Sequence, residues 1–299
     1  MRILITGSNG LLGQKIVARC LKHNIDFIAT SKGENRNPDC PADRYRELDI
    51  TDPPAISQLF DEARLTAVIH TAAITNVDYC ELNPAEAKLV NTDATGFLFE
   101  ACKQRGIHFE LVSTDFVFDG RKGDYSETDA VNPLSVYAQS KVDAEKILIG
   151  DNYTNWSIAR TIIVYGTGHN LSRSNMILWA LDALPKGDTM KLVNDQFRAP
   201  TWADDLAYGC VEIILRGKTG IFHLSGPQTY SIEAIVRKIA QHIGVENPVI
   251  ETISSATLNQ PAARPPKTGF DLRKAKKELE YSPKTIEETI DLLRFQLKQ

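Results

Sequence analysis

The chain opens with the stretch Arg2-Ile-Leu-Ile-Thr-Gly-Ser-Asn-Gly-Leu-Leu-Gly13. Its apolar run at residues 3–5 is typical of a strand that is buried on both faces of a parallel sheet. Three glycines at three-residue spacing follow, and residues 14–23 then have the periodicity of a helix. A strand, a glycine turn and a helix N-terminus together can bind phosphate, because free backbone N–H groups and the positive end of the helix dipole face the anion.

The glycine turn therefore predicts a nucleotide-binding site rather than an ordinary loop. A Cβ atom at these glycines would hold a pyrophosphate away or clash with the sheet. The motif also has the context that it requires, directly after a strand and at the start of a helix. The residues expected to line the cofactor here are Gly7, Ser8, Asn9, Gly10, Leu11, Leu12 and Gly13.

The composition argues against a nucleic-acid-binding protein and against a membrane-spanning one. The chain has 299 residues and a net charge of −4 without a basic run, which argues against nucleic acid as a partner. No apolar stretch approaches the length of a membrane span, and the chain starts on a strand, so we expect neither a membrane partner nor a signal peptide. The five cysteines are odd in number and lack metal-ligand spacing. They predict free thiols in a reducing cytoplasm, and no metal site.

Strand and helix patterns alternate along the first half of the chain. After the first strand, we expect strands at residues 27–30, 45–50, 67–70, 108–113 and 156–161, with helices between them. This order predicts an α/β fold with a doubly wound, Rossmann-like parallel sheet over residues 1–161. A smaller, mixed α/β substrate lobe is expected over residues 162–299, with segments that can interleave with the first part. The cleft between the two parts is the default site.

The end of the second strand bears on the choice of cofactor. A site that prefers NAD would place Asp or Glu there to hold the ribose 2′-hydroxyl. The sequence instead has Thr30, Ser31 and Lys32, with Arg36 soon after. Hydroxyls and cations suit a 2′-phosphate, so NADPH is favoured and NADH stays an alternative. On the other interpretation, the two cations are only the solvated charges of a polar loop.

Three residues further along the chain suggest acid–base chemistry. Tyr137 and Lys141 are four apart on an expected helix and so lie on one face of it. A lysine ammonium beside a phenol lowers the tyrosine pKa from about 10, toward the range of a general acid at neutral pH. Thr114 ends the fifth strand, where doubly wound folds place their ligands, and its hydroxyl can polarise a carbonyl oxygen.

In this order, the glycine turn, Thr114, Tyr137 and Lys141 resemble the Ser/Thr–Tyr–Lys arrangement of the extended short-chain dehydrogenases/reductases. The run at residues 112–120, Val-Ser-Thr-Asp-Phe-Val-Phe-Asp-Gly, is similar to one in the dTDP-4-dehydrorhamnose reductases. Further similar segments are residues 71–78, 194–201 and 263–266, so the resemblance spans nearly the whole chain. It implies an oxidoreductase of dTDP-rhamnose biosynthesis, in which a reduced nicotinamide cofactor converts a 4-keto nucleotide sugar to the 4-hydroxy sugar.

The resemblance also implies roles for individual residues. With the glycine turn, the implied cofactor-binding residues are Thr30, Ser31, Lys32, Asp49, Ile50, Ala72, Ala73, Ile74, Asn91, Tyr137 and Lys141. Asp49 and Ile50 would bracket the adenine ring, and Asn91 would support the active site. The implied substrate-binding residues are Thr75, Asn76, Val77, Asp115, Phe116, Ile163, Gln196 and Arg264. Arg264, and with it Arg198, offers a cation to the diphosphate of a dTDP-linked sugar.

The chain departs from the family at three of its substrate-side positions. Phe116 stands where the family usually has Tyr, Ile163 where it often has Trp, and Arg198 where it usually has Gly. These changes leave the hydride chemistry intact. They leave open which nucleotide and which sugar fit the lobe.

Other activities remain as alternatives. A dehydratase of the superfamily would need an Asp-Glu pair after Thr114, but Phe116 follows Asp115 here. An epimerase usually has an acidic residue after the second strand, which this chain lacks. A non-catalytic regulatory subunit, which would resemble the beta subunit of methionine adenosyltransferase, is free to lose the catalytic residues, yet all three are present. The sequence leaves a homodimer open.

Overall fold

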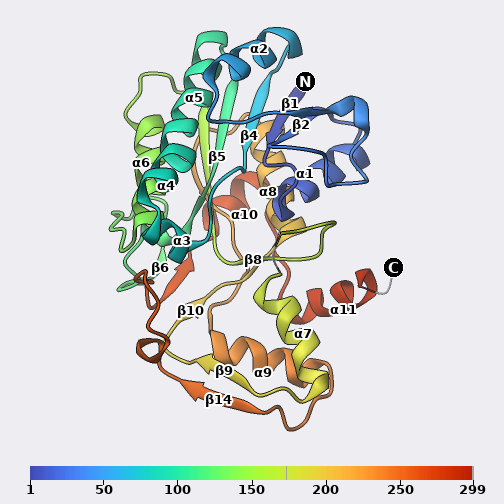
Figure 1. The fold of residues 1–299 in the computed structure, drawn as a ribbon, viewed down its shortest axis with the longest axis vertical. Coiled ribbons are helices and arrows are strands. Elements are labelled where there is room, and N and C mark those ends of the chain that lie inside the picture. Colours follow the sequence, from blue (N-terminus) through green and yellow to red (C-terminus); the bar gives the residue numbers. More distant parts are fainter. Residues whose placement is uncertain (173, 298–299) are drawn as a thin grey trace.

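The computed structural model describes residues 1–172 and 174–297, and it is built around a seven-stranded parallel sheet (Figure 1). The strand order is β12-β7-β5-β4-β1-β2-β3. The strands are β1 (Arg2–Thr6), β2 (Asp26–Ser31), β3 (Tyr45–Glu47), β4 (Ala67–His70), β5 (His108–Thr114), β7 (Trp156–Thr161) and β12 (Gly220–His223). The expected doubly wound sheet is confirmed.

The strand order reverses between β1 and β4, because the chain first builds outward through β2 and β3 and then returns to the other side of β1. At such a reversal the connections after the two strands lead to opposite faces, which leaves a crevice at their carboxyl ends. The register places Thr6 beside both Thr30 and His70 at this edge. The glycine turn leaves β1 at the same point.

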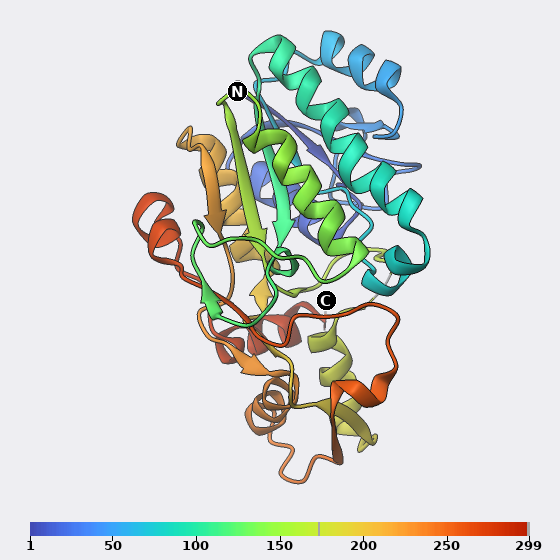
Figure 2. The same cartoon turned by 90° about the vertical axis from the view of Figure 1, so that its left-hand side faces the viewer.

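Helices cover both faces of the sheet. One face packs on α1 (Leu11–Lys22), α8 (Ala203–Leu215) and α10 (Arg273–Leu279), through an apolar cluster that includes Ile5, Val17 and Leu206. The other face packs on α2 (Pro53–Ala63), α5 (Ala94–Arg105) and α6 (Val136–Ile149). Figure 2 shows α5 and α6 side by side in front of the strands. The sheet is therefore buried on both sides, which explains its apolar runs.

A smaller part lies below the carboxyl ends of the strands (Figure 1). It consists mainly of α7 (Met176–Lys186), β9 (Met190–Val193), α9 (Ile232–His242), β14 (Ile250–Ile253) and α11 (Ile286–Gln296), which share an apolar core of their own. The chain crosses between the two parts more than once, because α8 and β12 return to the large sheet after residue 202. The segments thus interleave around residues 203–223.

Two local features differ from the sequence expectations. The third strand ends at Glu47 rather than at residue 50, and the helical segment expected between the fourth and fifth strands contains a π-helical turn. Its pieces are α3 (Val77–Leu82), α4 (Pro84–Lys88), a π-helical turn (Leu89–Asp93) and α5. A π-turn inserts one residue into a helix and is frequent at functional sites. Here it turns the side chain of Asn91 inward.

Short strands that the sequence did not indicate connect distant loops. They are β6 (Gly123–Tyr125), β8 (Val164–Tyr165), β10 (Phe197–Arg198), β11 (Thr201–Trp202), β13 (Tyr230–Ser231) and β15 (Thr268–Phe270). They pair as β6 with β15, β8 with β11 and β10 with β13. Segments of two or three residues have too few side chains for a recognisable period of two.

All five cysteines are buried and free. Among residues 1–172 and 174–297, no group of three or more His, Cys, Asp or Glu side chains is arranged to hold a metal ion. Within the same residues, no helix is both long and apolar enough to cross a membrane.

Candidate active site

The glycine turn lies at the strand-order reversal, and two of its glycines are required by the fold. Gly7 has a φ of 69°, and a Cβ there would lie 2.7 Å from the backbone nitrogen of Ala72. A Cβ on Gly13 would lie 2.4 Å from the carbonyl oxygen of Gly7. Real side chains do not tolerate such distances, so these two glycines allow the helix and the sheet to approach each other.

Gly10 is different, because a Cβ there would meet only the carbonyl oxygen of Gly7, at 3.2 Å. It is the N-cap of α1 and makes no side-chain capping bond, and no acidic residue stands in the first turn of the helix. The first-turn N–H groups and the positive helix end are thus left for an anion. These features fit the pyrophosphate of a dinucleotide.

The loop after β2 is fixed by Asn9. The Asn9 side chain donates to the carbonyl oxygen of Glu34 at 2.8 Å and accepts from the backbone N–H of Arg36 at 2.8 Å. Its backbone N–H donates to Ser31 Oγ at 2.9 Å. The polar residues expected near a 2′-phosphate are therefore tied to the glycine turn itself.

Lys32 and Asp49, both expected at the adenosine end of the cofactor, lie together. Lys32 Nζ is 2.8 Å from Asp49 Oδ2, although the Lys32 side chain is 82% exposed. The Asp49 carboxylate also accepts from the backbone N–H and the hydroxyl of Thr51. The bond from Lys32, aided by those from Thr51, lowers the pKa of Asp49 to about 2. Asp49 is therefore ionised at neutral pH, and its charge faces that of Lys32.

Asn91 joins the segment after β4 to α6. Its side-chain amide donates to the carbonyl oxygen of Ile74 and to Ser140 Oγ, both at 3.0 Å, and accepts from the N–H of Ile74 at 2.8 Å. Ser140 Oγ in turn donates to the carbonyl oxygen of Tyr137 at 2.7 Å. A buried network with every member satisfied is rigid. Asn91 thus fixes the small residues 72–74 relative to the helix that carries Tyr137.

Thr114, Tyr137 and Lys141 come together at the carboxyl end of β5 and the first turns of α6. Ser135 caps α6, since its Oγ accepts from the backbone N–H of Ala138 at 3.3 Å. The Tyr137 ring is 8% exposed and packs edge-on against Phe116, with ring centroids 6.0 Å apart.

Lys141 is almost completely buried and crosses from α6 to the sheet. Its Nζ donates to the carbonyl oxygen of Val112 at 2.8 Å. Burial lowers the pKa of Lys141 to about 8, and the neighbouring Glu145 opposes this change. The lysine is thus largely charged at neutral pH while lying in a site of low polarity.

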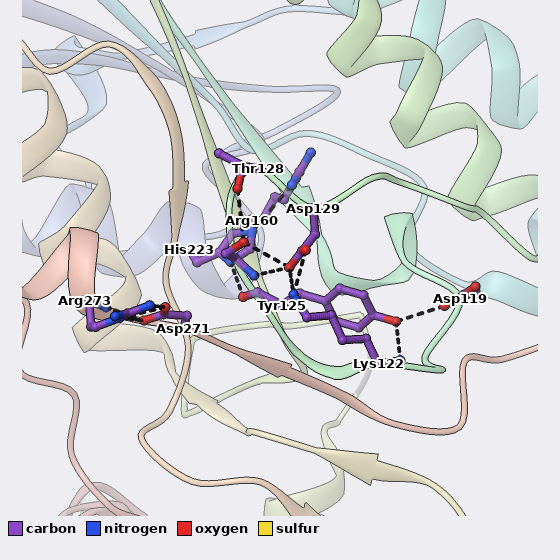
Figure 3. Close-up of polar contacts among 10 residues, drawn as sticks. Asp119, Lys122, Tyr125, Thr128, Asp129, Arg160, His223, Asp271 and Arg273 are labelled. Atoms are coloured by element: carbon purple, nitrogen blue, oxygen red, sulfur yellow. Dashed lines mark hydrogen bonds and ion pairs between the residues drawn. The ribbon is translucent and has the colours of Figure 1, made fainter.

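A buried ionic cluster that the sequence analysis missed lies under these residues. Glu145 forms two contacts with Arg160, Nε to Oε1 at 2.9 Å and Nη2 to Oε2 at 2.6 Å, and Ser113 Oγ donates to Oε1 at 2.6 Å. Arg160 also lies 3.4 Å from His223, which contacts the backbone of Tyr125 (Figure 3). Two clues were available in the sequence: Glu145 follows Lys141 by one helical turn, and Arg160 is a charged residue inside a buried strand.

The carboxylate of Asp115 points into the protein, although the sequence placed it against the substrate. Asp115 is 2% exposed, accepts from the Thr268 hydroxyl and from Thr114 Oγ1, the latter at 3.2 Å, and lies 3.8 Å from Arg198 Nε. Burial raises its pKa, and the Arg198 charge opposes the rise. Asp115 therefore contacts Thr114 rather than an open surface.

Arg264 forms an ion pair with Asp78 that links the last third of the chain to α3. Its two Nη atoms lie 3.1 and 2.7 Å from the two Asp78 carboxylate oxygens, and this lowers the pKa of Asp78. Arg198, in contrast, is 2% exposed and donates to three backbone carbonyl groups. Its guanidinium is buried and both Nη atoms already donate to carbonyl groups, so the expectation that Arg198 offers a cation to a diphosphate is wrong.

The remaining residues expected at the substrate lie on several elements. Asn76 caps α3, and Thr75 and Val77 flank it. Ile163 has a φ of 28°, a strained value for a β-branched residue, and its carbonyl oxygen accepts from the N–H of Thr201 at 3.0 Å. The carbonyl oxygen of Gln196 accepts from Ile232 at 3.1 Å. Strain of this kind clusters at ligand sites.

A hollow of about 540 Å³ lies elsewhere, between α1, α8 and residues 280–284. Its walls carry charges of both signs, among them Lys15, Asp204 and Lys284. None of the three catalytic candidates lines it. It is therefore a feature separate from the site described above.

Comparison with known proteins places the chain among sugar-nucleotide enzymes. Residues 1–296 match the family model described as the RmlD substrate binding domain. The chain is 34% identical over 295 residues to the probable low-salt glycan biosynthesis reductase Agl14 of Haloferax volcanii, covering 98% of this chain and 97% of that one. It is 29% identical to a dTDP-4-dehydrorhamnose reductase of Aggregatibacter actinomycetemcomitans, with 98% of both chains covered.

Among solved structures, a dTDP-4-dehydrorhamnose reductase of Clostridium acetobutylicum has a TM-score of 0.85 and 28% identity, with the whole of both chains covered. This likeness includes the smaller part, so it is not confined to the nucleotide-binding half. Together with the match over residues 1–296, it confirms the resemblance found in the sequence. The chain belongs to the RmlD family, that of the dTDP-4-dehydrorhamnose reductases in the extended short-chain dehydrogenase/reductase superfamily.

Proposed function

We propose that this protein is an NADPH-dependent reductase that converts a 4-keto, dTDP-linked sugar to the 4-hydroxy sugar. One observation supports this most: the buried Lys141 bonds Val112 of β5, and Phe116 contacts both Thr114 and Tyr137, so the three candidates lie at the junction of β5 and α6. The names of the relatives, which are reductases of dTDP-linked keto sugars, agree with this reaction class.

The cofactor would be held by residues of the glycine turn and of the segments after β2 and β3. The first-turn N–H groups of α1 would hold the pyrophosphate, with Gly10 leaving room for it. Asp49 and Ile50 would flank the adenine, and Lys32 and Arg36 would bind the 2′-phosphate that distinguishes NADPH from NADH. When bound there, NADPH supplies the hydride to the ketone carbon.

The protein's own residues handle the proton and the orientation of the ketone. Tyr137 donates the proton to the ketone oxygen, because the adjacent Lys141 charge favours the phenolate that is left behind. Lys141 is held by the carbonyl oxygen of Val112, so its charge has a fixed position. The Thr114 hydroxyl would orient the ketone oxygen by rotating its proton from Asp115 to that oxygen, while Oγ1 stays in place beside Asp115 and the N–H of Phe116.

Most of the residues that the sequence indicated for the substrate would bind the nucleotide sugar. They are Thr75, Asn76, Val77, Phe116, Ile163, Gln196 and Arg264, with Arg264 binding the diphosphate. Asp115 acts through Thr114 and not through the substrate, because its carboxylate is buried. The cytoplasmic location and a homodimer stay predictions.

The dehydratase alternative lacks support at Phe116, since that reaction needs a second acid where this apolar ring lies. The regulatory-subunit alternative predicts cofactor binding without turnover. An assay of NADPH oxidation with dTDP-4-keto-6-deoxy sugars separates it from the proposed function.

The central test replaces Tyr137 by Phe, which keeps the ring and deletes the acid. We expect kcat to fall by about 10²–10⁴, the range for general acid catalysis, with the binding of the nucleotide sugar nearly unchanged. Tyr208→Phe is the matched control, because the Tyr208 hydroxyl bonds Leu279 on the far side of the sheet. Near wild-type turnover in Tyr137→Phe removes Tyr137 from the role. A wild-type protein that binds NADPH but reduces no 4-keto sugar favours the regulatory subunit.

A further inference from the structure

Arg198 is the charged residue that links the smaller part to the end of β5. It is the second residue of β10, and its guanidinium is buried. Its Nη1 donates to the carbonyl oxygens of Phe197 and Pro266 at 2.7 and 3.3 Å, and its Nη2 to that of Pro265 at 2.6 Å. Phe197 adds a backbone bond to Pro266 at 2.7 Å. The segment next to Arg264 is thereby fastened to β10.

The same guanidinium faces the catalytic end of β5. Its Nε lies 3.8 Å from Asp115 Oδ2, and this carboxylate also accepts from Thr268, at the start of β15. The other oxygen, Oδ1, accepts from the Thr114 hydroxyl at 3.2 Å. The position of Thr114 Oγ1 is thus set by a carboxylate that Arg198 and Thr268 hold in place.

A second contact leads from Arg198 to Tyr137. The guanidinium carbon of Arg198 lies 5.5 Å from the centre of the Phe116 ring, and that ring packs edge-on against Tyr137. The backbone N–H of Phe116 also donates to Thr114 Oγ1 at 3.2 Å. Movement of Arg198 would therefore reach both residues that are proposed to contact the ketone oxygen.

We infer that Arg198 is a positioning residue, which fastens residues 265–268 to the end of β5 and thereby sets Thr114 and Phe116 in place beside Tyr137. This inference rests on the proposed reductase function. A buried charge is a costly way to join two segments, and apolar side chains often join them as stably. The planar guanidinium of Arg198 contacts carbonyl groups, a carboxylate and an aromatic ring at once, and it therefore fixes the positions of these groups relative to one another.

The test compares Arg198→Met, Asp115→Asn and the double variant with Leu192→Ala. Leu192 is buried in the core of the smaller part, on β9, so its truncation lowers Tm away from the site. Arg198→Lys keeps the cation and loses the planar guanidinium, so it replaces Arg198→Met in these measurements if the Met variant does not fold. Activity is measured well below every Tm, with kcat and KM for the dTDP-4-keto sugar and Kd for NADPH determined separately.

We expect Arg198→Met to lower kcat by about 10–100-fold, since a displacement near 1 Å has effects of this size. KM for the sugar should rise, because the segment that holds Arg264 loosens, while Kd for NADPH stays unchanged. Asp115→Asn should lower kcat by about tenfold with little change in KM. Because the two residues act through one contact, the double variant should be no worse than Arg198→Met.

Equal kcat values in Arg198→Met and Leu192→Ala, or additive losses in the double variant, overturn the inference. If the wild type reduces no 4-keto sugar, the proposed function is refuted but the positioning role of Arg198 is not. Calorimetric titration with dTDP then tests that role. Arg198→Met should then bind dTDP more weakly than Leu192→Ala does. Equal binding by these two variants, or no binding of dTDP by the wild type, overturns the positioning role as well.

Discussion

The glycine turn allows a sharp experiment, because its glycines serve different purposes. Gly10 has a φ of −78°, which any residue can adopt, and an added Cβ would meet one atom, at 3.2 Å. Gly13 has no such room, since its Cβ would lie 2.4 Å from the Gly7 carbonyl oxygen and 2.6 Å from the Ser8 Cα. We therefore expect Gly10→Ala to affect binding and Gly13→Ala to affect folding.

The magnitudes follow from these contacts. Replacing Gly by Ala at an N-cap lowers the free energy of unfolding by less than about 1 kcal/mol, so Gly10→Ala should keep nearly the wild-type Tm. Its methyl group occupies the space of the pyrophosphate, and a loss of about 1.4 kcal/mol in binding raises Kd for NADPH tenfold. Overpacking of Gly13→Ala against backbone atoms costs about 1–3 kcal/mol. Each kcal/mol lowers Tm by about 2–4 °C in a chain of this size.

Thermal unfolding without ligand and calorimetric titration with NADPH measure the two effects separately. Gly96→Ala is the matched control, because a Cβ on this residue of α5 would make an ordinary contact of 3.5 Å with Ile147 of α6. It should bind NADPH like the wild type. A Gly10→Ala variant with wild-type affinity would refute the phosphate site at this turn, and wild-type stability in Gly13→Ala would refute the packing argument.

Three further predictions concern charged residues. Replacing Lys32 and Arg36 by Ala should raise Kd for NADPH more than Kd for NADH in parallel titrations, because the Asp49 charge beside Lys32 would then repel the 2′-phosphate. Arg264→Ala should weaken dTDP binding and leave NADPH binding unchanged, since its ion pair lies on the substrate side. Burial raises the pKa of Glu110 well above 4.5, and the neighbouring Cys210 thiol only partly opposes this rise. The folded state thus keeps a proton that the unfolded chain releases, so stability falls as pH rises above about 4.5. Glu110→Leu should abolish this fall and raise the unfolding free energy by about 1–3 kcal/mol at pH 7 in denaturant titrations.

The parts of the site that could be predicted from the sequence are those made by local structure. The glycine turn is one, because strand, turn and helix follow one another within twelve residues and geometry fixes the rest. The pairing of Tyr137 with Lys141 is another, since both lie on α6 at helical spacing. Helix caps also belong here: Asp52 directly precedes Pro53, and its side chain accepts from the backbone N–H of Ala55 at the start of α2. None of these needs knowledge of how distant segments pack.

Contacts between segments far apart in the chain could not be predicted from the sequence. Arg264 could be named as a cation, but its partner Asp78 lies 186 positions earlier. Arg198 could be noted as a departure from the family, but nothing in its surroundings indicated that its donors would be filled by carbonyl groups from residues 265 and 266. Arg198 lies on β10 and its acceptors lie just before β15, and strands of two or three residues leave no recognisable pattern in the sequence.

The state of Lys141 shows why the catalytic residues cannot be understood by themselves. A lysine buried as deeply as this one loses its charge unless an acid stands nearby, and without its charge it no longer lowers the tyrosine pKa. Glu145 supplies that acid; it is equally buried, and Arg160 and Ser113 bond its two carboxylate oxygens and hold it in place. Ser113 comes from β5 and Arg160 from β7, which pair directly at these two residues. The acid–base chemistry proposed for α6 therefore depends on the order of strands in the sheet, a property that the spacing of Tyr137 and Lys141 does not contain.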